Sequence, residues 1–307
     1  MTLTPNELLE RFLQNQKANT QRRYHYALKD FQKTMKREPW ESDYSHALDY
    51  LQILRARIGQ FKTPYAPETI RNTYHALSSM TELLVSSGHA SINPFKAAKK
   101  LYGKFGRKQK RPTKLIPFRL VSRIIEAAGD ARYGVRDQAI LAVLFGGGLR
   151  RSELAALNLQ DLGVTPTGKL YLIVQDSKAG EAQERVLPDW AWVYYSELLQ
   201  QRKKAGAGPN DPLFVTPYGR KNSPNHESGR MVSRTIYAIF KRALKKFGID
   251  AGPHSARATF ASRMSAQGKS DRQISQALGH GTERSVRAYD KVSNLVGANP
   301  AWDLEYC

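Results

Sequence analysis

The side chains able to do chemistry in this chain are mostly cationic and lie in short groups spread over its second half. They are Arg150 with Glu153, Lys178, His254 with Arg257, His280, and Tyr289 nine residues after that histidine. Guanidinium, ammonium and imidazole groups bind anions, and a tyrosine hydroxyl becomes a good nucleophile when a base takes its proton. The chain has no GxxxxGK[ST] loop and no HExxH motif, and its seven histidines are too scattered to suggest a metal site. We therefore expect an anionic substrate and no metal or nucleotide cofactor.

Each of these groups also has an ordinary structural explanation when it is taken alone. Arg150 and Glu153 are three residues apart, which is the spacing of an ion pair on one face of a helix. His254 and Arg257 have the same spacing, and such a pair occurs often by chance. The lysine is compatible with an exposed turn, the histidine after Gly279 with a helix cap, and the tyrosine with packing.

Three consecutive glycines, Gly146 to Gly148, lie just before Arg150 and resemble a phosphate-binding loop at first sight. No lysine follows them at the spacing of a P-loop. The apolar segment AILAVLF comes directly before them. We interpret the glycines as a tight turn at the end of a buried helix.

The charge balance points to a polyanionic partner. Lys and Arg number 48 and Asp and Glu 27, which gives a formal charge of +21. Residues 1–110 carry 19 basic and 9 acidic side chains, and residues 111–307 carry 29 and 18, so both halves are basic. Nucleic acid is the first candidate, although ribosomal and membrane-surface proteins share this signature.

Length and composition indicate a globular protein with one large or two ordinary domains. The 307 residues are 41% hydrophobic and 10% aromatic, unlike a disordered polycation. The single cysteine, Cys307, excludes a disulfide within the chain. The first residues lack the layout of a signal peptide, and no apolar run has the roughly 18 residues of a membrane span. We expect a soluble, cytoplasmic protein, associated with the nucleoid when it binds DNA, and no membrane partner.

The first 95 residues have the pattern of a small helical bundle. Residues 4–7, TPNE, form a capping box with proline at the first helical position. A second helix is expected from Thr20, and a third from Pro67 to near Gly88. Residues 44–58 favour a further helix.

A strongly basic segment, residues 96–114, follows the predicted bundle. It has no acidic residue and contains Gly103, Gly106 and Pro112, so we predict an interdomain linker rather than a regular core element. Its nine cationic residues are Lys96, Lys99, Lys100, Lys104, Arg107, Lys108, Lys110, Arg111 and Lys114. A solvated loop is the ordinary alternative, but two basic halves flank the segment, which favours a strap along DNA phosphates.

The second half, residues 115–307, mixes helices with a small amount of strand. Helices are expected over 119–128 and 136–146. Residues 169–174 and 184–187 are rich in β-formers and are separated by a polar turn, so they predict a hairpin. Further helical patterns cover 233–247, 255–267, 271–278 and 283–290.

In this order and at these spacings, the groups resemble the tyrosine recombinase (phage integrase) family, and the resemblance covers essentially the whole chain. It implies a mainly α fold with a small β-sheet. A helical, SAM-like core-binding domain at 1–95 would be followed by the basic linker at 96–114 and an α+β catalytic domain at 115–307. The layout is similar to the short Xer-type and integron-type enzymes, because no arm-binding domain precedes the helical one.

The resemblance also implies a role for each chemical group. Arg150 matches the first catalytic arginine with Glu153 as its acidic neighbour, Lys178 the hairpin lysine, His254 and Arg257 the HxxR pair, His280 the second His/Trp position, and Tyr289 the nucleophile. The sequence departs from the family pattern at Ser255, Ala256 and Ala258, around the HxxR pair. The hairpin turn has Ser177 and Ala179 where the family often has glycines, although the segment RVLP at 185–188 fits.

Physical chemistry agrees with these roles. Negative charge builds on a phosphodiester as it is attacked, and two guanidiniums can hold both non-bridging oxygens with fixed forks. His254 would act as the base for Tyr289, and Lys178 would protonate the leaving 5′-oxygen. The product is a 3′-phosphotyrosyl bond, which conserves the bond energy, so rejoining needs neither ATP nor a metal.

The expected function is that of a DNA recombinase that clamps double-stranded DNA between residues 1–95 and 115–307. It would act as a homotetramer on two DNA sites, with accessory DNA-bending proteins as further partners. Three alternatives stay open: a catalytically silent DNA-binding or architectural protein, a relaxing type IB topoisomerase, and a nuclease.

In the tail, 291–307, the apolar residues Trp302, Leu304 and Tyr306 either pack on the chain's own surface or dock into a neighbouring protomer.

Overall fold

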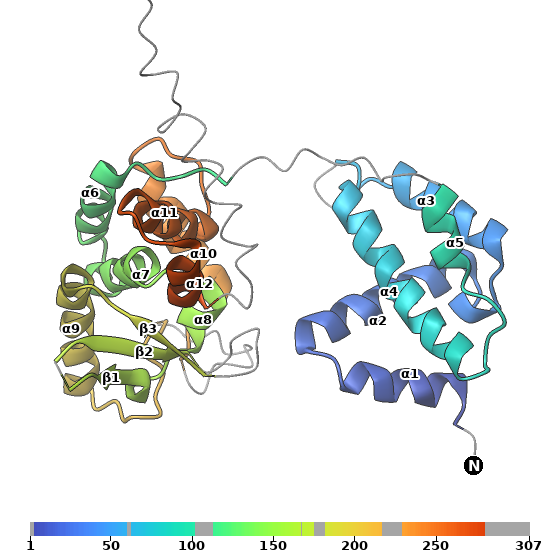
Figure 1. The fold of residues 1–307 in the computed structure, drawn as a ribbon, viewed down its shortest axis with the longest axis horizontal. Helices are drawn as coiled ribbons and strands as arrows, with labels where there is room; N and C mark the ends of the chain where they lie inside the picture. Colours follow the sequence, from blue (N-terminus) through green and yellow to red (C-terminus); the bar gives the residue numbers. More distant parts are fainter. Residues whose placement is uncertain are drawn as a thin grey trace, which may run out of the picture. The chain divides into compact units, whose positions relative to one another are not determined.

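The computed structural model describes residues 3–59, 63–101, 113–166, 168–174, 182–216 and 229–279, without the side chains of residues 97 and 99–101. The chain divides into two compact units, Met1–Arg111 and Pro112–Cys307 (Figure 1). Within the described ranges, no helix is both long and apolar enough to cross a membrane. The mainly α fold with a small β-sheet is confirmed.

The first unit is built from helices. These are α1 (Pro5–Gln14), α2 (Ala18–Met35), α3 (Tyr44–Ala56), α4 (Pro67–Ser86) and α5 (Pro94–Leu101), with a short 3₁₀ helix at Pro39–Glu41. The predicted capping box is present, because the Glu7 amide donates to Thr4 Oγ1 at 3.3 Å and the Thr4 amide to Glu7 Oε2 at 2.8 Å. Four of these helices were predicted from the sequence, and α2 begins two residues earlier than expected.

Helix α5 includes the first residues of the basic segment, which the sequence predicted to be an interdomain linker rather than a regular core element. Asn93 caps this helix by accepting the Lys96 amide at 3.2 Å. Phe95 is buried and meets Phe31 and Tyr74 edge to face, with ring centroids 5.3 and 5.7 Å apart. Residues 96–101 therefore belong to the helical unit, and residues 102–112 of the predicted linker lie outside the described residues.

The second unit places a three-stranded sheet beside a group of helices. In chain order the elements are α6 (Phe118–Ala128), α7 (Gly134–Gly146), α8 (Arg151–Ala156), a 3₁₀ turn (Leu159–Asp161), β1 (Leu162–Val164), β2 (Leu170–Val174), β3 (Gln183–Val186), α9 (Asp189–Lys204), α10 (Ser233–Lys245), α11 (Pro253–Ala266) and α12 (Asp271–Leu278). The sheet is antiparallel in the order β1-β2-β3. The β2–β3 pairing confirms the predicted hairpin, whereas β1, α8 and α9 were not predicted.

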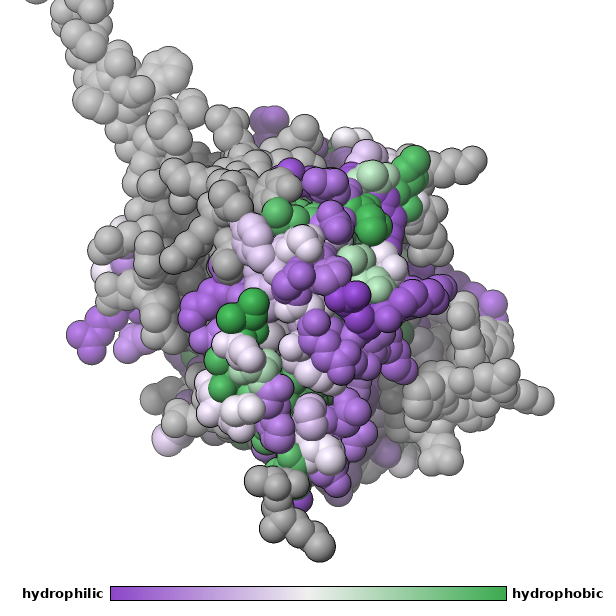
Figure 2. Space-filling view, turned by 90° about the vertical axis from the view of Figure 1, so that its right-hand side faces the viewer, coloured by the Kyte–Doolittle hydropathy of each residue, from purple (hydrophilic) through white to green (hydrophobic). Residues whose placement is uncertain are grey.

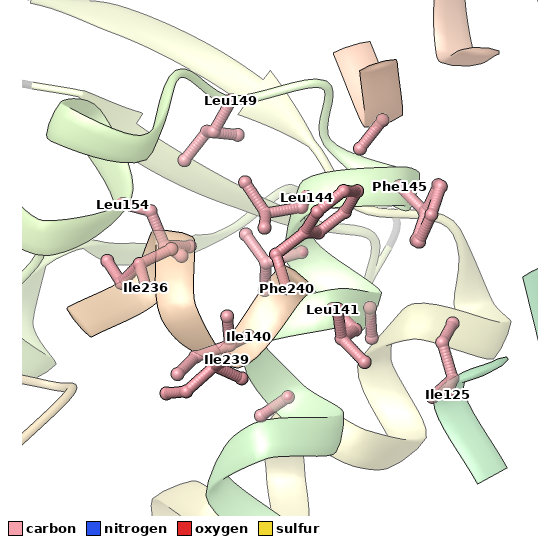
Figure 3. Close-up of a cluster of buried hydrophobic side chains, with 14 of the residues drawn as sticks. Ile125, Ile140, Leu141, Leu144, Phe145, Leu149, Leu154, Ile236, Ile239 and Phe240 are labelled. Atoms are coloured by element: carbon pink, nitrogen blue, oxygen red, sulfur yellow. The ribbon is translucent and has the colours of Figure 1, made fainter. Parts of the chain in front are cut away.

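Helix α7 forms the centre of the second unit. It packs against α6, α9, α10 and α11, and Figure 1 shows it in the middle of this unit. Its side chains Ile140, Leu144 and Phe145 meet Ile239 and Phe240 of α10 in one apolar cluster (Figure 3). Residues 139–146 of this helix are buried on all sides, which explains why that part of its sequence is entirely apolar. The helix thus gives the turn that follows it a rigid base.

The surface drawn in Figure 2 is mainly hydrophilic. Its hydrophobic side chains form separate small patches among the described residues of that face. This distribution fits a chain in which charged residues make up 24% of the sequence.

The glycine turn after α7 has the tight geometry that the sequence predicts. Gly148 has a φ of +58°, which is the left-handed region. A Cβ at this position would lie 2.8 Å from Phe260 and 2.9 Å from Leu278. The turn therefore depends on glycine both for its backbone conformation and for the close approach of α11 and α12.

Gly148→Ala should lower the free energy of unfolding by about 3 kcal/mol, because left-handed strain and overpacking add. Gly268 is a matched control in the same unit, since it has a φ of +76° and open space where a Cβ would stand. Gly268→Ala should cost about 1 kcal/mol from strain alone. Equilibrium unfolding in urea measures both, and equal losses would show that the packing contacts at Gly148 do not matter.

Candidate active site

Arg150 lies at the start of α8, immediately after the glycine turn. Its backbone amide donates to Glu153 Oε2 at 2.7 Å, and its guanidinium forms a short ion pair with Oε1 of the same carboxylate. Glu153 thereby satisfies the amide of Arg150, the residue that caps α8, and also holds the side chain of that arginine. The ion pair that the spacing indicated is present.

Glu153 is more than the partner of a neighbouring arginine. It is only 3% exposed, and a buried carboxylate is costly unless cations compensate it. Arg257 Nη1 lies 3.9 Å from Glu153 Oε2, although more than a hundred residues separate them in sequence. One carboxylate therefore lies between the two guanidiniums that the sequence analysis named as phosphate ligands.

Arg257 comes from α11 and is held from three sides. It is 1% exposed. Its Nη1 donates to the carbonyl of Gly148 and its Nη2 to the carbonyl of Leu278, each at 2.5 Å. These bonds join α11 to the glycine turn and to the end of α12. The position of this guanidinium is accordingly fixed by three segments of the chain.

His254 lies one turn before Arg257 on the same helix but has the opposite environment. It is exposed in the first turn of α11, whereas Arg257 is buried. The spacing of three residues brings the two side chains to neighbouring positions on one face of the helix, although only Arg257 is buried. The imidazole is thus accessible to solvent close to the arginine centre.

A further guanidinium, Arg185 of β3, belongs to this site and was not predicted as a site residue. It is 2% exposed, and its Nη2 donates to the same Leu278 carbonyl at 3.0 Å. Burial lowers the pKa of Arg185, while the Glu153 carboxylate opposes that effect and the charge of Arg150 adds to it. The signal for it was strand alternation, because Arg185 pairs with the buried Leu172 of β2 and shares its face.

Arg230 also supports the site without having been predicted. Its Nη1 donates to the carbonyls of Ala155, Ala156 and Leu157, the last at 3.3 Å, at the end of α8. Cations are favourable at helix C-termini, where carbonyls have no partner within the helix. Glu153 at one end and Arg230 at the other therefore hold α8 in place.

Several predicted site residues cannot be placed in this geometry. Lys178, His280 and Tyr289 lie outside the described residues. So do Lys104, Arg107, Lys108, Lys110 and Arg111, and the predicted helix 283–290 and tail 291–307. For Lys99 and Lys100 the backbone belongs to α5, but their side chains are not described.

The remaining two basic-segment residues, Lys96 and Lys114, are exposed. Lys96 Nζ lies 2.8 Å from Glu82 Oε1, in a surface ion pair of the kind that contributes little to stability. Neither residue is part of the arginine centre, and both are accessible from solvent.

The described part of the site is a cationic centre. Arg150 and Arg257 lie against one carboxylate and Arg185 interacts with it electrostatically, so the local charge stays positive after that ion pairing. Among the residues that the structure describes, no group of three or more His, Cys, Asp or Glu side chains could hold a metal ion. Guanidiniums fixed in this way bind oxyanions, and phosphate groups match their fork of donors.

Comparison with known proteins gives the family. Residues 115–295 match the phage integrase family. Tyrosine recombinase XerA of Pyrococcus horikoshii is 30% identical over 246 residues, which are 76% of this chain and 79% of that protein. Tyrosine recombinase XerC of Thermodesulfovibrio yellowstonii is 31% identical over 251 residues, or 78% and 74% of the two chains.

A solved structure shares the fold at lower sequence identity. The Tn1549 transposon integrase, in complex with transposon right end DNA, superposes with a TM-score of 0.66 over 94% of each chain at 15% identity. The family match spans more than half of this chain, and the two recombinases align over most of their own length. The chain therefore belongs to the phage integrase family and is an enzyme of the tyrosine recombinase/integrase class.

Proposed function

We propose that this protein is a site-specific DNA recombinase that cuts and rejoins DNA through a 3′-phosphotyrosyl intermediate. The observation that carries the proposal is the meeting of Arg150 and Arg257 on the buried carboxylate of Glu153. They come from different helices, so their meeting is a property of the fold. The relatives named as tyrosine recombinases, and the integrase solved with DNA, support DNA as the substrate.

The arginine centre suits the demands of attack on a phosphodiester. In the pentacoordinate transition state, negative charge gathers on the non-bridging oxygens. Donors already fixed in place stabilise that charge without reorganising, and losing one from a closed site typically costs about 3–4 kcal/mol. Arg150 is the more accessible of the two arginines, so we expect it to meet the phosphate first.

The proton transfers are assigned to the remaining predicted residues. The Tyr289 hydroxyl attacks the phosphorus and passes its proton to His254, which is exposed beside the arginine centre. The bond from phosphorus to the 5′-oxygen breaks, and Lys178 protonates that oxygen. His280 donates a hydrogen bond to the phosphate. The reverse attack by a 5′-hydroxyl rejoins the strand and releases the tyrosine, so the number of phosphodiester bonds is unchanged.

Exchange between two duplexes requires more than one active site. We propose a homotetramer that holds two DNA sites, with each chain binding duplex through both of its basic units. The excess of positive charge in both halves of the sequence supports this division of the contacts. Recombinant products, rather than relaxed plasmid alone, distinguish this assembly from a topoisomerase.

Tyr289→Phe should bind DNA as the wild-type chain does and form no covalent adduct, because it lacks only the attacking oxygen. The measurement is a denaturing gel of protein incubated with nicked duplexes cut from DNA that flanks the gene, in EDTA and without ATP. Wild-type protein should give an adduct to the 3′-phosphate of one DNA fragment, and the other fragment should end in a free 5′-hydroxyl. An adduct with the phenylalanine variant would contradict the assignment of the nucleophile.

Arg150→Ala should slow adduct formation at saturating DNA by about 100- to 1,000-fold, with little change in DNA affinity. Arg150→Lys should restore little of the rate, because an ammonium group lacks the fork of donors. The matched control is Arg151→Ala, since Arg151 is exposed and lies over the Tyr237 ring. Equal effects at the two positions would show that the rate depends on general charge rather than on Arg150.

Glu153→Gln should lower the free energy of unfolding by about 3 kcal/mol, because it leaves buried guanidiniums facing a neutral amide. Adduct formation should slow as well, since the carboxylate no longer fixes Arg150. Urea unfolding and single-turnover cleavage measure the two effects. Asp250→Asn, which removes the carboxylate of an exposed ion pair with Lys241, is the control and should change neither. A Glu153→Gln protein of unchanged stability would disprove the compensating role of this carboxylate.

A further inference from the structure

Arg185 occupies a position where the fold would favour an apolar side chain. It lies in β3 opposite Leu172 of β2, and Leu172 and Val174 on that face are buried in the main core of the unit. The arginine itself is 2% exposed. Burial of a charge costs several kcal/mol unless its partners compensate it, and an apolar residue of similar size often gives equal or greater stability. The contacts that this arginine makes must therefore account for its presence here.

The bonds of Arg185 join the hairpin to the end of α12. Its Nη2 donates to the Leu278 carbonyl at 3.0 Å and to Gln183 Oε1 at 2.5 Å, and its Nη1 donates to the Glu184 carbonyl at 3.2 Å. Leu278 is the last residue of α12, where carbonyls carry partial negative charge and lack helical partners. A cation is favourable at that end of a helix.

The same carbonyl serves the arginine centre. Leu278 accepts hydrogen bonds from Arg185 and, at 2.5 Å, from Arg257. Movement of the end of α12 would therefore displace a guanidinium that the proposed reaction uses. The Nε of Arg185 is buried without a hydrogen-bond partner, a further cost of keeping this side chain here.

Gly279 shows how closely β3 and α12 approach each other. It ends α12 with a φ of +59°. A Cβ at this position would collide with the guanidinium of Arg185 and with the Gln183 amide. The arginine therefore fills the space beside Gly279, directly before His280 in the sequence.

We propose that Arg185 is a positioning residue for strand cleavage: it fixes β3 to the C-terminal end of α12, at the carbonyl that also holds Arg257. β3 begins five residues after Lys178, and α12 ends two residues before His280. The junction between β3 and α12, called the anchor below, is therefore close in sequence to both of these predicted site residues. The inference rests on the proposed recombinase function. It adds a residue whose effect on the reaction is transmitted through the main chain and Arg257.

The test compares Arg185→Met, Arg185→Lys and a matched control, Arg202→Met. Arg202 is likewise an arginine with a buried, unpartnered Nε and a bond to a main-chain carbonyl, that of Pro212, but it lies on α9. Three quantities are measured for each protein below its unfolding temperature. They are the cleavage rate at saturating DNA, the affinity for DNA, and the hydrogen-exchange rate of the peptide that covers residues 271–279.

We expect Arg185→Met to cleave about 100-fold more slowly at saturating DNA, because small displacements in an active site have effects of this size. Its DNA affinity should be unchanged, and exchange in 271–279 should rise about tenfold with the loss of a charged hydrogen bond. Arg185→Lys should recover part of the rate, and it replaces the methionine variant if that protein does not fold. Arg202→Met should match the wild type in all three measurements.

Cleavage by Arg185→Met at the wild-type rate would overturn the inference. So would a lower rate that is fully explained by a smaller fraction of folded protein. If the wild-type chain forms no adduct while Arg185→Met raises exchange in 271–279, the recombinase proposal fails and the anchor at α12 stands. Unchanged exchange in 271–279 in both Arg185 variants would overturn the anchor whatever the activity.

Discussion

A buried carboxylate, that of Glu153, is the constraint on which the arrangement of this site depends. At 3% exposure it is compatible with the folded state only because cations lie against it. Arg150, three residues earlier at the start of α8, supplies one and Arg257 of α11 supplies another, and the charge of Arg185 on β3 also acts on the carboxylate. The compensation of one negative charge thus brings together the glycine turn, two helices and the edge of the sheet.

The same arrangement leaves the centre with more positive than negative charge. The Arg257 guanidinium is held by the main-chain carbonyls of Gly148 and Leu278, and that of Arg150 by the Glu153 carboxylate, so their directions are set before any anion arrives. A site of this kind stabilises charge that develops on a phosphate without moving its donors. The apolar core around α7 serves the chemistry indirectly, because it gives the glycine turn a rigid base.

Local patterns predicted most of the elements, and the exceptions have physical reasons. The capping box at residues 4–7, the hairpin and the glycine turn each depend on a few neighbouring residues. Helix α5 was missed because its dense positive charge concealed the apolar spacing of Phe95 and Ala98. The sequence predicted the pairing of Arg150 with Glu153, but the contact with Arg257 and the role of Arg185 depend on tertiary packing that no local pattern contains.

The most direct test of the central claim is a crystal structure of the Tyr289→Phe protein bound to its duplex site. The account predicts that the non-bridging oxygens of the scissile phosphate lie within hydrogen-bond distance of Arg150 and Arg257, with Glu153 still between the two guanidiniums. A scissile phosphate held by other residues, while both arginines stay engaged with Glu153 alone, would contradict it.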